Sequence, residues 1–218
     1  ALRILPEARF ERILLKAGLN SVFQTDESAE WLPVAGIDYF AGDNSTVYAS
    51  YTETEQQPDF QTLYYSDPFR VGNPLLAQQR SKNAELGFKQ FLAARLDGRV
   101  GGFYRRLENA NDWTQNAPGG IWTATDLGDL DIGGVDGEIT FQASEDLVLK
   151  AYYQWLEKES VDVYAGLYEL DYPEHMLNMV AWWKFLDQFA VEFSQTHTAL
   201  PCLAPVPANV LPLTVALP

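Results

Sequence analysis

Alternation of apolar and polar positions is the dominant pattern along the chain. From Leu147 to Trp155 the odd positions are apolar, and the odd positions from Leu177 to Phe185 repeat the pattern. A period of two places successive side chains on opposite faces of a strand. The pattern therefore predicts nine strands, at about residues 14–25, 31–41, 46–55, 80–92, 98–108, 130–143, 147–158, 175–185 and 188–197.

The connections between these strands differ in length in a regular way. Short turns are expected at 42–44, 144–146 and 186–187, and long loops at about 56–79, 109–129 and 159–174. Short turns at one end and long loops at the other are typical of the antiparallel meander in an outer-membrane barrel.

Aromatic residues lie at the ends of the predicted apolar faces, among them Tyr153, Trp155, Trp183 and Phe185. Rings in these positions suit the two girdles at the membrane interfaces. They would equally suit the core of a soluble β-sandwich, whose strands also alternate. The pattern alone therefore leaves a barrel and a sandwich open.

Residues 199–218 break from this pattern, with five prolines and no charged residue. Proline removes backbone donors from a ladder and stops helices. We therefore expect two parts, a β-rich part at 1–198 and a proline-rich irregular tail at 199–218. The chain begins at Ala1 without a signal-like segment, which favours a processed product or a piece of a longer protein.

Composition narrows the function classes. The 218 residues are 47% hydrophobic and 21% charged, which favours an ordered chain. Fifteen basic against thirty acidic residues give a net charge of −15, which argues against nucleic acid as a partner. The single cysteine, Cys202, excludes an internal disulfide framework and a multi-cysteine metal centre.

The negative charge is concentrated between Leu107 and Trp183, where fifteen acidic residues accompany only two basic ones. The stretch is either a set of solvated surface loops or an acidic mouth that attracts a cationic ligand group.

No established catalytic or metal-binding pattern is found. His175 lies near Asp171 and Glu174 but lacks a second histidine at ligand spacing, and no G-x-S-x-G or phosphate-binding loop occurs. Carboxylate pairs such as Asp129 and Asp131 could serve a glycoside hydrolase only at a specific separation in a cleft. We predict no catalytic residue, no metal and no cofactor, and hence no enzyme.

One segment is more specific than periodicity. A strand reading Tyr48-Ala-Ser-Tyr51 is followed by a proline-containing loop with Leu63-Tyr64, and then by the pattern N-P-x-L-x-x-E-x-S-x-x-x-E-x-G. Gln79 replaces the first glutamate of that pattern. The residues that match in register are Asn73, Pro74, Leu76, Ser81, Glu85 and Gly87. The segment resembles the late barrel of TonB-dependent outer-membrane receptors, and the resemblance extends over roughly residues 14–197.

The resemblance implies an all-β fold, part of a transmembrane β-barrel from the C-terminal half of such a receptor, with the plug domain absent. It implies a bacterial outer-membrane location, contact with outer-membrane lipid, and uptake of a scarce nutrient such as a ferric siderophore, cobalamin or a similar small chelate. Uptake would be driven through the TonB system, which would act on an N-terminal region missing here.

Aromatic side chains in the long loops are the candidate ligand contacts, because flat rings bind flat ligand surfaces. Packing of the loops on themselves is the alternative role. Negative loops suit a cationic or metal-bearing ligand better than an anionic ferric chelate. The candidates are Tyr64, Tyr65, Phe69, Trp113, Trp122, Tyr164 and Tyr168.

Three other readings remain. A small passive porin would need an even number of strands and a closing strand. A soluble β-sandwich module for carbohydrate would not need detergent. A glycoside hydrolase would lose turnover when either of two carboxylates is replaced.

Overall fold

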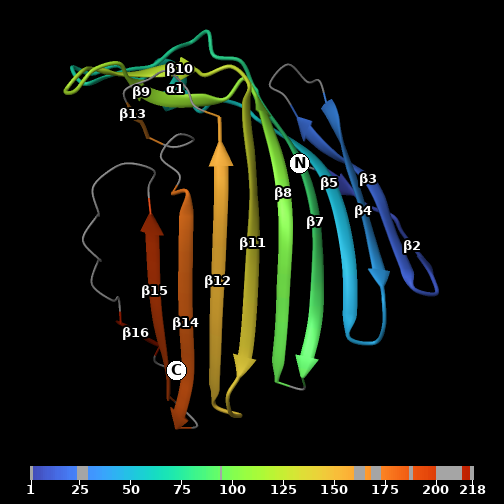
Figure 1. Ribbon diagram of the computed structural model, residues 1–218. Helices are drawn as coiled ribbons and strands as arrows, with labels where there is room; N and C mark the ends of the chain where they lie inside the picture. The colour runs from blue at the N-terminus through green and yellow to red at the C-terminus, as the bar shows by residue number, and fades with distance from the viewer. Residues whose placement is uncertain are drawn as a thin grey trace.

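The computed structural model describes residues 2–23, 29–93, 95–159, 165–167, 173–186, 189–199 and 213–216. Its main feature is one large antiparallel sheet, in which chain neighbours lie side by side (Figure 1). The nine predicted strands are all present, so the predicted meander is confirmed. They are β3 (Ile13–Phe23), β4 (Ala29–Phe40), β5 (Ser45–Gln56), β7 (Gln79–Ala93), β8 (Leu96–Glu108), β11 (Leu130–Gln142), β12 (Leu147–Lys158), β14 (His175–Leu186) and β15 (Phe189–Ala199).

Short strands extend this sheet at both edges. β1 (Leu2–Ile4) and β2 (Glu7–Phe10) both pair with β3, and Pro6 lies between them. Because proline has no backbone N–H, the ladder is interrupted there. At the other edge, β16 (Leu213–Ala216) pairs with β15. Five residues of the predicted irregular tail are therefore strand, Ala199 in β15 and the four of β16, while 200–212 and 217–218 lie outside the described residues.

The two faces of the large sheet differ in chemistry because the register keeps like residues in line. Val47 is opposite Phe88, which is opposite Val100. On the other face Ser50 is opposite Glu85. We call the face with Val47, Phe88 and Val100 the apolar face, and the face with Ser50 and Glu85 the polar face.

Nothing in the described part of the chain covers the apolar face. Leu86 and Val100 remain 62% and 56% exposed, and no second sheet packs against them. A β-sandwich would bury these side chains between two sheets. The β-sandwich interpretation is therefore wrong. An outward-facing apolar band is instead what a transmembrane barrel requires.

The long connections form a second sheet, which the sequence did not predict. Its order is β13-β9-β10-β6, from β13 (Ala165–Gly166), β9 (Asn111–Gln115), β10 (Trp122–Asp126) and β6 (Arg70–Val71). Figure 1 shows it with the short helix α1 (Phe60–Tyr64) at one end of the large sheet, opposite the short turns. We call these two ends the loop end and the turn end.

A buried apolar cluster lies where the long strands β8 and β11 pass into the connections of the second sheet. Leu130 and Ala110 are fully buried, and Leu107, Ile132 and Leu156 complete the cluster. Ala110 also accepts a hydrogen bond from the Leu127 backbone N–H at 2.7 Å, and its own N–H donates to the Gly128 carbonyl at 2.8 Å. The loop end is thus packed and hydrogen-bonded rather than a set of independent loops.

Candidate functional site at the loop end

The segment 57–78 begins with a capped helical turn. The Asp59 carboxylate accepts a hydrogen bond from the Thr62 backbone N–H at 2.6 Å and caps α1. This is the arrangement that aspartate favours at the start of a helix. The hydrogen bonds from Thr62 lower the pKa of Asp59, since they favour the charged carboxylate.

Asp67 organises the next turn. Its Oδ1 accepts from the backbone N–H groups of Phe69 and Arg70 at 2.7 and 2.6 Å, and its Oδ2 accepts from the Tyr65 hydroxyl at 3.0 Å. The bond from the Phe69 N–H lowers the pKa of Asp67, and the bond to Asp67 raises the pKa of Tyr65. The side chain therefore sets the backbone path into β6.

Segment 57–78 contributes to the lining of a cavity of about 420 Å³ at the loop end of the polar face. Gln56 and Gln79 are directly opposite in the β5–β7 register, and both line it. Further walls come from α1 and from the first residues of β9. The volume lies within the range of small-molecule pockets.

Hydrogen bonds between segments hold these walls together. The Asn111 backbone N–H donates to Gln79 Oε1 at 3.1 Å, and Asn111 Nδ2 donates to the Ala77 carbonyl at 2.9 Å. Asp112 is only 2% exposed and accepts a hydrogen bond from the Leu167 backbone N–H at 3.2 Å. Two separate long connections thus line this cavity, and a third holds Asp112 in place through Leu167.

The predicted aromatic residues fall into two groups. Tyr64 and Phe69 are exposed, and the Tyr64 ring contacts the Phe60 ring at 5.2 Å between centroids. Trp113 is 6% exposed and, with Trp122, belongs to an apolar cluster under the second sheet. Packing thus occupies most of the Trp113 ring. Tyr164 and Tyr168 lie outside the described residues.

Tyr65 and Trp113 line the cavity together, but most of its lining was not predicted from the sequence. Five side-chain amides contribute to it. Side-chain amides are common in loops, so nothing in the sequence indicates that these five belong to one site. Only the structure shows that they meet at one cavity. They are Gln56, Gln57, Gln61, Gln79 and Asn111.

A second group of polar side chains lies further along the polar face. The Tyr48 hydroxyl donates to Glu85 Oε1 at 2.6 Å, and Arg99 donates to Tyr48 and Glu85 at 3.0 Å each. Arg99 also forms an ion pair with Asp136. The charges of three neighbouring strands, β7, β8 and β11, are thereby paired, and buried Asp136 has the partner that a buried charge requires.

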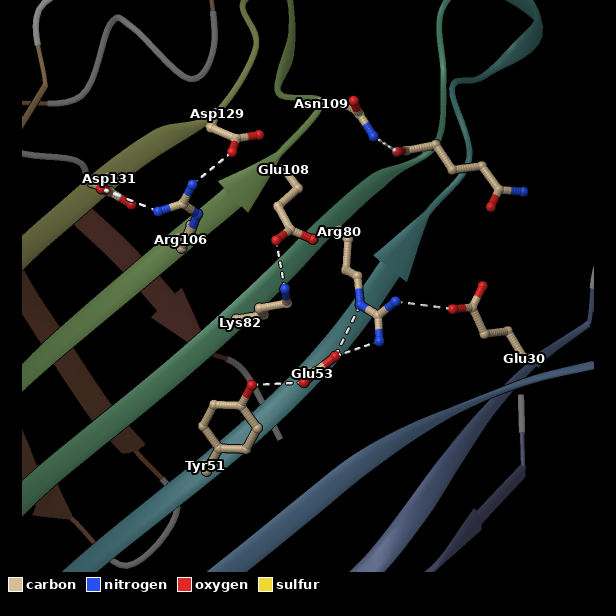
Figure 2. A network of polar contacts seen from close by, with 11 residues as sticks. Glu30, Tyr51, Glu53, Arg80, Lys82, Arg106, Glu108, Asn109, Asp129 and Asp131 are labelled. Carbon is tan, nitrogen blue, oxygen red and sulfur yellow. Dashed lines mark hydrogen bonds and ion pairs between the residues drawn. The ribbon is translucent and has the colours of Figure 1, made fainter.

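A ladder of ion pairs crosses the sheet near the loop end (Figure 2). Arg80 contacts Glu53 at 2.5 Å and Glu30 at 3.0 Å, and Lys82 contacts Glu108 at 2.5 Å. Arg106 continues the ladder through Asp129, at 2.7 Å, and Asp131, at 3.8 Å. On the apolar face these charges begin where the apolar residues of β5, β7 and β8 end, so they mark one limit of the apolar band.

Metal-binding chemistry is not evident in the described residues, where no group of three or more His, Cys, Asp or Glu side chains could hold an ion. His175 Nδ1 instead hydrogen-bonds the Tyr153 hydroxyl at 2.9 Å. Within the same residues, no helix has the length and apolarity to cross a bilayer.

Comparison with known proteins decides the family. The profile of the family described as "TonB dependent receptor-like, beta-barrel" matches residues 1–199. The chain belongs to the TonB-dependent receptor family. Members of this family are outer-membrane β-barrel receptors and transporters, not enzymes.

A curated relative is the vitamin B12 transporter BtuB of Vibrio vulnificus (strain YJ016). It is 30% identical over 86 residues, which cover 39% of this chain and 13% of the relative. The alignment thus spans only a small part of that transporter, and vitamin B12 transport is a property of the whole protein.

Solved structures of TonB-dependent receptors share the fold. The siderophore receptor PirA of Pseudomonas aeruginosa matches with a TM-score of 0.62 at 20% identity, over 86% of this chain and 34% of that one. PirA of Acinetobacter baumannii matches with a TM-score of 0.62 at 16% identity, over 86% and 31%. The copper transporter OprC matches with a TM-score of 0.59 at 14% identity, over 88% and 33%. At these identities the likeness shows the fold alone.

Proposed function

We propose that the chain forms part of the barrel wall and loop surface of a bacterial outer-membrane receptor for active nutrient uptake. The observation that carries the proposal is the single sheet with one exposed apolar face and one polar face, in a chain whose residues 1–199 match the family. The apolar face would meet outer-membrane lipid. The polar face would line the lumen of the complete barrel.

Energy for uptake would come from the TonB system, acting on a part of the full receptor outside this chain. The relatives support a ligand of the small chelate or cofactor class, because they are named for vitamin B12, siderophores and copper. A ferric siderophore or cobalamin is the proposed cargo. The loop end is the proposed ligand-binding side, through Tyr64, Tyr65, Phe69, Trp113, Trp122, Tyr164 and Tyr168.

Uptake measurements in cells test this function. The gene for the full-length protein that carries this chain is deleted, and uptake of radiolabelled ferric siderophore and cobalamin is compared with that of the parent and of a strain lacking TonB. We expect one substrate to lose high-affinity uptake in both strains, and the plasmid-borne gene to restore it only when TonB is present.

Restoration of uptake without TonB would contradict the proposal, since it would indicate a passive pore. Recovery of the protein in the soluble fraction without detergent would contradict the membrane location. Either result would remove the receptor interpretation for this chain.

A further inference from the structure

The cavity at the loop end has a lining that is unusual in composition. Its five side-chain amides come from β5, the segment after it, α1, β7 and β9. A carboxamide offers two N–H donors and a carbonyl acceptor without carrying a charge. A site lined in this way can satisfy a ligand that presents donors and acceptors in alternation. We call it the carboxamide pocket.

One acceptor in this lining has no partner. Among the described residues, Asn111 Oδ1 is buried and receives no hydrogen bond, while Asn111 Nδ2 donates to the Ala77 carbonyl. A buried acceptor without a donor costs free energy. Asn111 Oδ1 has almost no accessible surface, so a ligand N–H or O–H group would relieve this cost only after a shift of the side chains around it. A ligand that carries such donors is therefore favoured.

The walls of the pocket are set before any ligand arrives. Gln79 and Asn111 are joined by the bond between the Asn111 N–H and Gln79 Oε1, and Asp112 is held by the Leu167 N–H. At the start of α1, Asp59 is fixed by the Thr62 N–H. Pre-organised polar groups bind more tightly because little conformational entropy is lost on binding.

The charges in the lining disfavour an anionic ligand. Asp59 and Asp112 contribute two carboxylates, and Arg70 contributes the one guanidinium among the lining residues. A ligand with several negative charges would meet more negative than positive charge, and repulsion of this kind excludes the wrong partner. An uncharged ligand meets no such barrier.

We propose that the carboxamide pocket binds an uncharged ligand group that carries both hydrogen-bond donors and acceptors, such as primary amides or vicinal hydroxyls. The inference rests on the proposed receptor function and narrows its ligand away from anionic ferric chelates. Two sources have this chemistry, the amide side chains of a corrinoid and the hydroxyls of a neutral sugar. Tyr65, which is 44% exposed, would add aromatic contact at the pocket wall.

Calorimetric titration of the full-length protein that carries this chain, purified in detergent, tests the proposal. The probes are cyanocobalamin, maltotriose and ferric enterobactin. The variants are Gln57→Leu and Gln61→Leu, singly and combined, because leucine keeps the approximate size and removes the polar groups. The matched control is Gln142→Leu, which lies at the turn end of β11.

We expect one of the two uncharged probes to bind, and the double variant to weaken that binding at least tenfold. The Gln142→Leu control should bind as the unchanged protein does. Binding of cyanocobalamin would identify the amide source, and binding of maltotriose the hydroxyl source.

The proposal is overturned if neither uncharged probe binds, or if the double variant binds as the control does. Binding of ferric enterobactin that the double variant abolishes would also overturn it, but would leave the receptor function standing. Restoration of uptake by the plasmid-borne gene in a strain lacking TonB would instead remove the receptor function itself, so the two failures are distinguishable.

Discussion

The ring of Tyr48 lies across Gly87 on the neighbouring strand. The two residues are directly opposite in register, and a Cβ added at Gly87 would lie 2.4 Å from the Tyr48 Cζ and Oη atoms. Tyr48 is 8% exposed, and its hydroxyl is held by Glu85 and Arg99. Glycine is required here for space rather than for an unusual backbone angle.

Replacing Gly87 with alanine should therefore destabilise the barrel by about 1–3 kcal/mol, the usual cost of overpacking. Tyr48 would have to leave its position and lose its contacts with Glu85 and Arg99. The matched control is Gly98→Ala, where the nearest atom to the new Cβ is 3.6 Å away. Urea unfolding in detergent micelles measures the difference, and equal midpoints for the two variants would contradict the steric explanation.

Arg99 should be more important to stability than a similar cation in the ladder near the loop end. Its partner Asp136 has a side chain only 8% exposed, whereas Glu108, the partner of Lys82, is 29% exposed. We expect Arg99→Met to cost about 1–3 kcal/mol, below the range for a fully buried pair because Arg99 is partly exposed. Lys82→Met should cost about 1 kcal/mol or less.

Neutralising the partners provides the check on this argument. Asp136→Asn combined with Glu85→Gln should recover most of the stability lost in Arg99→Met, because the uncompensated carboxylates are then gone. If the triple variant unfolds at the same urea concentration as Arg99→Met, the loss has another cause than unpaired charge.

The two faces of the sheet should respond differently to a positive charge. Leu149 and Gln154 lie in the same strand, the first on the apolar face and the second on the polar face. Leu149→Arg should reduce stability in a bilayer by about 2–4 kcal/mol if it lies near the midplane. Gln154→Arg should have little effect. Refolding titrations in phospholipid vesicles measure both, and a larger loss for Gln154→Arg would reverse the assignment of the faces.

Acidification should loosen the turn at Asp67. The folded structure lowers the pKa of this carboxyl through the backbone N–H groups of Phe69 and Arg70. A lowered pKa means that the stabilisation is present above the pKa of the unfolded chain and is lost as pH falls through the folded value. Hydrogen exchange of residues 65–71, corrected for the intrinsic pH dependence, should therefore lose protection below about pH 4.

Asp67→Asn provides the control, since its amide oxygen can still accept both backbone bonds but does not titrate in this range. Protection of the same residues should then be independent of pH between about 3 and 6. A pH dependence that persists in Asp67→Asn would assign the effect to another group.

The matching sequence pattern gains a physical meaning from the Tyr48–Gly87 contact. Tyr48 begins the Tyr-Ala-Ser-Tyr strand, and Glu85 and Gly87 close the N-P-x-L pattern. The register places these three residues together on the polar face, where glycine provides room for the ring and glutamate accepts from its hydroxyl. Two separate parts of the pattern thus describe one packing unit.

The loop end was much less predictable. In the sequence nothing distinguishes Trp113 from other aromatic residues in polar loops. In the structure it lies in β9 of the second sheet, and its side chain is buried in an apolar cluster. That sheet depends on the parallel pairing of Trp122 with Arg70 and the antiparallel pairing of Ala165 with Gln115. Such contacts join connections that are distant in the sequence, so no local sequence pattern predicts them.

The sequence by itself determined the nine long strands, their order and the chemistry of both faces, because a period of two is a local property and short turns leave each strand only its neighbour to pair with. Only the tertiary structure decided which loop residues are buried and which amides converge on the carboxamide pocket. Those positions depend on pairing between distant segments, where burial is fixed by the whole fold rather than by the type of residue.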